Sequence, residues 1–217
     1  MGDYMKNVTE MTHPLIQHKI SRLRDKKTTT NEFRSLVEEI AMLMGFEALK
    51  DLPTHEVEVE TPIETCMTPV IEGRNLAVVP ILRAGLGMVN GILNLVPTAK
   101  VGHIGLYRDE ETHEPHEYYC KMPKDIDQRI CLVVDPMLAT GGSLELAYQA
   151  FLSKGKPAKL HICCVIASRQ GIERLQNAFP GDDVTLWVAA IDPQLNDRAY
   201  IVPGLGDAGD LSFGEKQ

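Results

Sequence analysis

Residues 130–153 read ICLVVDPMLATGGSLELAYQAFLS, and this stretch decides the fold. Residues 130–134 form a continuous apolar run rich in β-branched side chains, which is typical of a strand buried on both faces. The apolar residues between Ser143 and Ser153 then recur at helical spacing. A buried strand followed directly by a helix indicates an α/β fold with a mostly parallel sheet flanked by helices.

The same alternation of strand and helix patterns recurs along much of the chain. Further buried strands are predicted at 76–82, 101–106, 160–167 and 184–191, and further helices at 86–95 and 171–178. Right-handed crossovers place such helices on the faces of one parallel sheet. Ligands bind these sheets beyond the carboxyl ends of the strands, so a site is expected in the residues that follow each strand.

The first 50 residues are expected to form a helical extension. Apolar residues recur at helical spacing over residues 16–23 and again over 33–44, and Thr29 precedes Glu32 with the spacing of a capping box. The sequence contains no internal repeat, low-complexity tract or evident linker. Residues 1–217 are therefore predicted to form a single domain, which is long enough to bury a core without disulfides.

Composition excludes several classes of partner. The chain has 217 residues, with 22 Lys and Arg against 30 Asp and Glu, and a formal net charge of −8. Nucleic acids and anionic membranes attract an excess of positive charge, so neither is an expected partner. The sequence has neither a membrane-spanning apolar run nor the apolar core of a signal peptide, which predicts a cytoplasmic protein. Its five cysteines, which follow no metal or disulfide pattern, are expected to be buried free thiols.

The segment DPMLATGGS, which follows the first strand, is suited to bind a monophosphate. Gly141 and Gly142 let successive backbone N–H groups converge, where the N-terminus of the next helix adds about half a positive charge. Thr140 and Ser143 supply hydroxyls, and Asp135 suits vicinal sugar hydroxyls. A triphosphate-binding P-loop is excluded because no lysine follows Gly142. The alternative, a plain turn with a helix cap, leaves the strand-end acid without a role.

A second strand end, over residues 78–91, carries Arg83 beside closely spaced glycines. The glycines spell G-x-G-x-x-x-G, one residue too long for the dinucleotide fingerprint, so a Rossmann dehydrogenase is the weaker alternative. A fixed guanidinium beside accessible backbone suits a polyanion such as pyrophosphate. Arg83 as a buried ion-pair partner stays open as the other interpretation.

The C-terminal stretch 200–210 is predicted to be an ordered ligand loop. It combines several glycines with Asp207 and Asp210, and it can present backbone N–H and C=O groups to a flat ligand. Its G-x-G-x-x-G spacing is not read as a dinucleotide motif, because too few residues follow for a helix.

The longest loop, RDEETHEPHE at 108–117, is expected to be a lid. It lies between two strand-like segments, and charged loops of this length are more often functional than idle. His113 and His116 do not predict a metal site, because Pro115 prevents the helix that such a histidine pair uses.

Together these segments resemble the uracil phosphoribosyltransferases. The resemblance spans nearly the whole chain and is carried by VPILRAGLG at 79–87, YRDEET at 107–112, DPMLATGGS at 135–143 and YIVPGLGDAGD at 200–210. It implies the phosphoribosyltransferase fold, with a β-hairpin-like lid at 108–117 and a uracil-binding loop at 200–210. The stretches 168–170 and 192–194 depart from the family pattern and lie outside these four segments.

The resemblance also implies a role for each site residue. The catalytic residues, which hold the leaving pyrophosphate, would be Arg83, Arg108 and Asp207. Phosphoribosyl pyrophosphate (PRPP) would be bound by these three and by Asp135, Pro136, Met137, Leu138, Ala139, Thr140, Gly141, Gly142 and Ser143. Uracil would be bound, largely through the backbone, by Ile201, Gly206, Asp207 and Ala208. Mg²⁺ would arrive with PRPP near Asp207, with no direct protein site of its own.

The implied reaction transfers the 5-phosphoribosyl group of PRPP to N1 of uracil, giving UMP and diphosphate in pyrimidine salvage. The enzyme would be a pentosyltransferase, a class of glycosyltransferase, and a homodimer or higher homo-oligomer. GTP activates some members of the family, which leaves a GTP effector open. The alternative is a non-catalytic nucleotide-sensing regulator of the same fold. Arg108 and Asp207 argue against it, because a sensor has little need of leaving-group residues.

Overall fold

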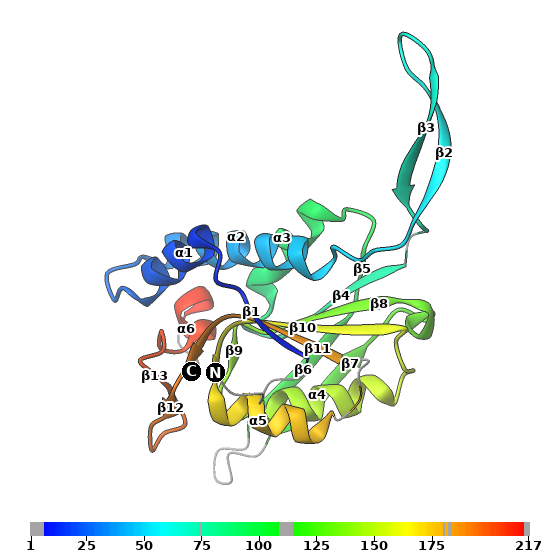
Figure 1. Cartoon of the computed structure of the whole chain (residues 1–217). Helices are drawn as coiled ribbons and strands as arrows, with labels where there is room; N and C mark the ends of the chain where they lie inside the picture. Colours follow the sequence, from blue (N-terminus) through cyan, green and yellow to red (C-terminus); the bar gives the residue numbers. More distant parts are fainter. Residues whose placement is uncertain (1–6, 74, 109–114, 180, 182–183, 215–217) are drawn as a thin grey trace.

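A computed structural model describes residues 7–73, 75–108, 115–179, 181 and 184–214 (Figure 1). Its main sheet has the strand order β1-β11-β10-β8-β4-β6-β7, with β5 paired to β4 and β9 paired to β10. The strands are β1 (Val8–Glu10), β4 (Leu76–Leu82), β5 (Lys100–Val101), β6 (His103–Arg108), β7 (Pro115–Lys121), β8 (Ile130–Val134), β9 (Met137–Leu138), β10 (Lys159–Ser168) and β11 (Val184–Asp192). All of these pairings are parallel except that of β6 with β7. The predicted α/β fold with a mainly parallel sheet is confirmed.

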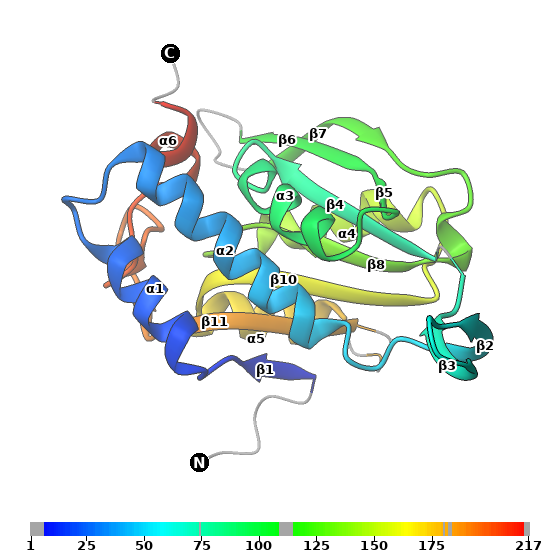
Figure 2. The same cartoon turned by 90° about the horizontal axis from the view of Figure 1, so that it is seen from above.

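Helices lie on both faces of this sheet (Figure 1). One face carries α1 (Pro14–Arg24), α2 (Thr30–Ala48) and α3 (Leu86–Leu95), and the other carries α4 (Gly142–Leu152) and α5 (Arg169–Ala178). Figure 2 shows α2 running across the sheet. The short elements are the 3₁₀ helix η1 (Ile126–Gln128), the paired strands β12 (Gln194–Leu195) and β13 (Ile201–Val202), and α6 (Ala208–Phe213). Each face of the sheet has its own cluster of buried apolar side chains, so the core is double.

The N-terminal region is built into this core. Phe33 and Met44 of α2 are almost fully buried, and the side chain of Thr29 accepts a hydrogen bond from the backbone N–H of Glu32, as the capping spacing predicts. Both expected helices are present, as α1 and α2, but the strand β1, which precedes them and pairs in parallel with β11 at the edge of the sheet, was not predicted. Three residues are too few to show a period of two in the sequence.

Strands β2 (Thr54–Glu60) and β3 (Thr65–Ile71) form an antiparallel arm that projects from the body of the molecule (Figure 1). Most of its side chains are exposed, including the apolar Ile63 and Met67, whose exposed fractions are 90% and 60%. Apolar side chains held out on an arm are a feature of surfaces that meet another protein.

The expectation of buried thiols holds for most cysteines. Cys131, Cys163 and Cys164 are buried, and burial raises the pKa of the Cys163 thiol to about 12, which makes it a poor nucleophile. Cys120 is half-buried, and Cys66 on β3 is exposed, so the expectation is wrong for Cys66.

His161 on β10 is a buried neutral side chain. Only 2% of it is exposed, and its Nδ1 accepts a hydrogen bond of 3.0 Å from Trp187 Nε1. Burial, and then the charge of Lys159, lower its pKa to about 4. An unfolded histidine titrates near 6.5, so the unfolded chain binds the extra proton first as the pH falls. The stability that depends on neutral His161 is therefore complete above pH 6.5 and lost toward pH 4.

Replacing His161 by glutamine, which keeps an acceptor for Trp187, should flatten the stability profile between pH 7 and 4. In the parent protein the shift contributes a loss of about 3 kcal/mol in the free energy of unfolding over that range. Urea denaturation at pH 7 and pH 4 measures the difference. His18→Gln, at an exposed position of α1, is the matched control and should keep the parent profile. Equal pH profiles in His161→Gln and the parent would contradict this account.

Candidate active site

The predicted site residues follow neighbouring strands of the sheet. The carboxyl ends of β10, β8, β4 and β6 are consecutive, because these strands are neighbours in this order. The chain leaves β4 through α3 toward β6, and it leaves β8 through α4 toward β10 on the other side. The connections thus diverge between β4 and β8, and ligand sites of open α/β sheets lie at such a switch point.

The predicted phosphate loop begins at Asp135, which is buried and accepts a hydrogen bond of 3.3 Å from the backbone N–H of Met137. Strand β9 then pairs with β10, and Gly141 adopts a left-handed conformation with φ +82° before α4 begins. No described side chain caps the N-terminus of α4, so its first N–H groups are left for a ligand. The arrangement is that of an anion site on a helix end.

Ser168 holds this loop from the end of β10. Its fully buried hydroxyl donates to the carbonyl of Ala139 at 2.6 Å and accepts from the backbone N–H of Gly171 at 2.9 Å. A Cβ on Gly171 would lie 2.4 Å from the same carbonyl of Ala139, so only glycine allows this close approach. Ser168, which belongs to the stretch that departs from the family pattern, therefore supports the predicted phosphate loop.

Arg83 lies in the turn between β4 and α3, close to the end of β8. A Cβ on Gly85 would lie 2.4 Å from the carbonyl oxygen of Val134, so the two strand-end loops are in direct backbone contact. Arg83 Nη2 lies 3.2 Å from Asp210 Oδ1 and donates to the carbonyl of Gly214 at 3.3 Å. The Arg83 side chain is ion-paired but 39% exposed, so it is not the buried partner of the alternative interpretation.

The C-terminal loop meets both of these loops. A Cβ on Gly209 would lie 3.8 Å from the Cβ of Ala84, and the backbone N–H of Ala208 contacts Met137 Sδ at 3.3 Å. Residues predicted to bind PRPP and residues predicted to bind uracil therefore lie side by side. Ile201 is buried on β13, and Gly206 is exposed with φ +91°.

One expectation for this loop is wrong. Residues 208–213 form the short helix α6, although too few residues were expected to follow the glycines for a helix. Asp207 is its N-cap, and its Oδ1 accepts from the backbone N–H of Asp210 at 3.0 Å. A capped helix of little more than one turn needs only these few residues.

The predicted lid lies between the antiparallel strands β6 and β7. Strands β6 and β7 pair up to Arg108 and Pro115, and Tyr107 stacks on His116 with ring centroids 5.4 Å apart. Leu82 of β4 pairs with Gly105 of β6, which brings the base of this hairpin next to the Arg83 turn. The tip, residues 109–114, lies outside the described residues, as does His113.

All four segments lie within the part of the chain that matches a family of known proteins. The sequence model of the family described as uracil phosphoribosyltransferase matches residues 10–215. The chain belongs to the uracil phosphoribosyltransferase family.

Curated members of the uracil phosphoribosyltransferase family match the chain along almost its full length. The protein from Alkaliphilus metalliredigens is 55% identical over 212 residues, which are 98% of this chain and 100% of that protein. The protein from Streptococcus mutans is 57% identical over 206 residues, 95% of this chain and 97% of that protein. The solved structure of the AQ2163 protein from Aquifex aeolicus has a TM-score of 0.89 and 40% identity, covering 95% of this chain and 98% of that one.

Two polar residues beside the predicted uracil loop of this family member were not predicted from the sequence. Arg24, the last residue of α1, and the buried Asp192, the last residue of β11, both bind the backbone of Gly204. Asp192 follows the same rule as the other site residues, because it lies at the carboxyl end of a strand. In the sequence it was noted only as part of a departure from the family pattern. Nothing in the sequence around Arg24 indicates its contact with a residue 180 positions away.

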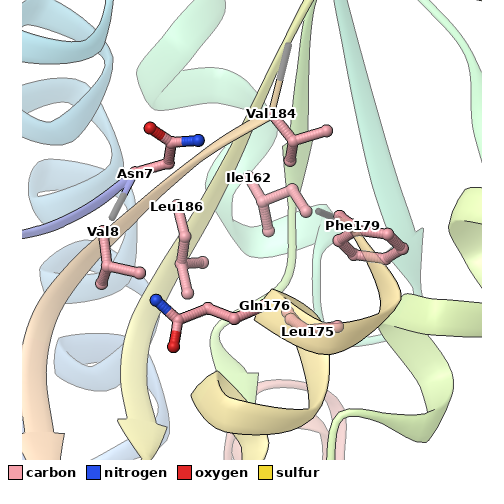
Figure 3. A pocket seen from close by; sticks show the side chains of 8 residues that line it. All are labelled: Asn7, Val8, Ile162, Leu175, Gln176, Phe179, Val184 and Leu186. Atoms are coloured by element: carbon pink, nitrogen blue, oxygen red, sulfur yellow. The ribbon is translucent and has the colours of Figure 1, made fainter. Parts of the chain in front are cut away.

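A cavity of about 110 Å³ lies elsewhere, between α5 and the strands β10 and β11 (Figure 3). Its lining is mostly apolar and includes Ile162, Leu175 and Phe179. Val184, the first residue of β11, also lines it, which places it toward the amino ends of the strands. The cavity is therefore separate from the candidate active site of this uracil phosphoribosyltransferase family member.

Proposed function

We propose that this chain transfers the 5-phosphoribosyl group of PRPP to N1 of uracil, forming UMP and diphosphate. The observation that supports the proposal most is the meeting of three loops at the β4–β8 switch point. The phosphate loop contacts the C-terminal loop through Met137 and Ala208, and the Arg83 turn contacts it through Asp210. PRPP carries a 5-phosphate and a diphosphate, so it needs an anion site and an arginine close together. The flat uracil ring must bind next to them.

The phosphate loop, residues 135–143, would hold the phosphoribosyl end of PRPP. The uncapped N–H groups at the start of α4 suit the 5-phosphate, with the hydroxyls of Thr140 and Ser143 as further donors. The carboxylate of Asp135, which is buried at the end of the strand, would accept hydrogen bonds from the ribose hydroxyls. Ser168 and Gly171 keep the loop in place from behind.

Arg83, Arg108 and Asp207 would act on the leaving diphosphate. The exposed pair of Arg83 with Asp210 can open, because an ion pair in contact with water is weak and a diphosphate offers more charge. Asp207 would lie near the Mg²⁺ that arrives with PRPP, and the positive charge of that ion would help to neutralise the diphosphate. Among the described residues, no three or more His, Cys, Asp or Glu side chains are grouped so that they could hold a metal ion.

Backbone groups of Ile201, Gly206 and Ala208, together with Asp207, would recognise uracil. The N–H of Ala208 is occupied by a thioether, a weak acceptor that a uracil oxygen readily replaces. A fixed N–H facing O4 and a fixed C=O facing N3–H accept uracil, whereas cytosine presents the reverse pattern. Buried groups left unpaired in this way discriminate by several orders of magnitude.

Catalysis in this scheme consists of positioning and charge neutralisation. The bond between N1 of uracil and C1 of the ribose forms as the bond from C1 to diphosphate breaks, with inversion, through a transition state of oxocarbenium character. The proton on N1 is released to the diphosphate or to water. The chain's residues hold the two reactants in line and neutralise the leaving group, and no side chain needs to act as nucleophile. The 108–117 lid would exclude water, which otherwise hydrolyses the activated sugar.

Incubation of the purified chain with uracil, PRPP and Mg²⁺ tests the proposal, with chromatography to detect UMP and diphosphate. Cytosine, thymine and hypoxanthine serve as competing bases and should give far less nucleotide. UMP binding without any turnover would instead favour the nucleotide-sensing alternative. Adding GTP to the same assay decides whether GTP acts as an effector.

We further propose that residues 1–217 act as one domain within a homodimer or higher homo-oligomer in the cytoplasm. The β2–β3 arm, with Ile63 and Met67 exposed, offers apolar area that a second copy can cover. All five cysteines are free, which fits a reducing compartment. None of the described helices is both long and apolar enough to span a bilayer. Analytical ultracentrifugation measures the oligomeric state.

A further inference from the structure

Helix α1 is tied to the uracil loop through one ion pair. Arg24 Nη1 and Nη2 donate to Asp192 Oδ2 and Oδ1 at 2.8 and 2.7 Å, which is the two-pronged geometry that fixes both side chains. Arg24 Nη1 also donates to the carbonyl of Gly204 at 2.8 Å. Asp192 Oδ2 accepts from the backbone N–H of Gly204 at 2.9 Å. Both backbone groups of Gly204 are thus held by the same pair.

Gly204 is the turn around which this loop is organised. Its φ is +62°, and a Cβ there would lie 2.0 Å from the carbonyl oxygen of Ile201, so only glycine fits. It stands between Ile201 and Gly206, two of the residues proposed to bind uracil. The conformation of Gly204 therefore sets how the backbone groups on its two sides face a bound base.

The pair is protected from water and hence strong enough to fix this turn. The side chain of Asp192 is 5% exposed and that of Arg24 is 23% exposed. Charge-assisted hydrogen bonds shielded from solvent hold their geometry better than exposed ones. The main sheet supplies the rigid end of the contact, because Asp192 is the last residue of β11 and pairs with Ser168 of β10.

We propose that Arg24 and Asp192 are positioning residues for uracil recognition, which act by fixing the Gly204 turn. The inference rests on the proposed function. Neither residue is assigned a contact with the reacting atoms, so their loss should weaken uracil binding and base discrimination. PRPP binding should change little, because residues 135–143 are held separately, through Ser168 and the pairing of β9 with β10.

A purely structural role for Arg24 is distinguishable from this one. Helix α1 is anchored independently, by the buried side chains of Ile16, Ile20 and Leu23 and by Gln17, whose amide donates to the carbonyls of Met11 and Ala189. Loss of the guanidinium therefore frees the Gly204 turn without detaching the helix. The loss in the free energy of unfolding should therefore be smaller than the loss in the free energy of uracil binding.

The test compares Arg24→Met, Arg24→Lys and Asp192→Asn with Arg22→Met. Arg22 is the matched control, since it lies on the same helix and its side chain pairs with Glu32 of α2, away from the loop. Arg24→Met should raise the KM for uracil by about tenfold or more, as expected for the loss of one buried charge-assisted interaction. It should also lower the preference for uracil over cytosine, and change the KM for PRPP less than about twofold. Arg24→Lys keeps the positive charge but cannot make the two-pronged hydrogen bonds of a guanidinium. Its KM for uracil should therefore lie between those of the parent and of Arg24→Met.

The outcomes separate this inference from the proposed function. UMP formation by the parent chain with an unchanged uracil KM in Arg24→Met and Asp192→Asn would overturn the positioning role alone. Equal rises in the KM values of uracil and PRPP, in parallel with a lower melting temperature, would also overturn it in favour of a purely structural role. If Arg24→Met fails to fold, the KM values of Arg24→Lys for uracil and for PRPP distinguish the positioning role from the purely structural one. Absence of UMP formation by the parent chain would instead refute the proposed function.

Discussion

Replacing Asp207 by asparagine should lower kcat by about 10²-fold or more. Asp207 caps α6 by accepting from the N–H of Asp210, and asparagine caps helices as well as aspartate does. The substitution therefore removes the negative charge and keeps the local structure. In the proposed mechanism this charge helps to place the magnesium-loaded diphosphate, so its loss acts on the transition state for departure of that group.

Steady-state kinetics with saturating uracil and PRPP measures the effect, and circular dichroism checks the fold. Asp197→Asn removes the same charge from an exposed turn between β12 and β13 and should leave kcat unchanged. A folded Asp207→Asn variant with a kcat within about twofold of the parent would remove Asp207 from the proposed catalytic residues.

Replacing Gly85 by alanine should lower kcat/KM for PRPP by about 10²-fold. The new methyl group would lie 2.4 Å from the carbonyl oxygen of Val134 and 2.8 Å from the backbone N and O of Ile81. Backbone atoms of two core strands cannot yield, so the turn that carries Arg83 must move instead. A displacement of about 1 Å is enough to cost catalysis two orders of magnitude.

Gly87→Ala is the matched control in the same turn. Its methyl group would meet Val37 Cγ1 at 3.4 Å, an ordinary van der Waals contact, and alanine also favours the helix that begins there. This variant should keep the parent kinetics and be at least as stable. If Gly85→Ala retained the parent kcat/KM, the close contact of the Arg83 turn with β8 would be irrelevant to PRPP binding.

Elements with a strong hydrophobic signal could be predicted from the sequence. Strands 76–82 and 130–134 and helix 86–95 begin and end where they were expected, because continuous apolar runs and regular stripes have few competing interpretations. The site segments at 79–87 and 135–143 also lie at strand ends as predicted, since sheet topology dictates where such loops emerge.

Elements that gain their stability from distant partners could not be predicted from the sequence. The arm at 54–71 was not predicted, because β2 has no core face and only two apolar residues, Val57 and Val59, alternate with its glutamates. Strand β1 is defined by its pairing with β11, and Arg24 by its contact with Asp192. Local sequence carries no record of such long-range contacts.

The pairing of β1 with β11 bears on how the chain folds. Val8 lies opposite Leu186, so this edge of the sheet closes only when the two ends of the chain meet. Contacts of such sequence separation form late, because a large loop must first be ordered. During synthesis the first strand must wait until β11 has left the ribosome. Arg24 of α1 likewise reaches Asp192 only after β11 has been made.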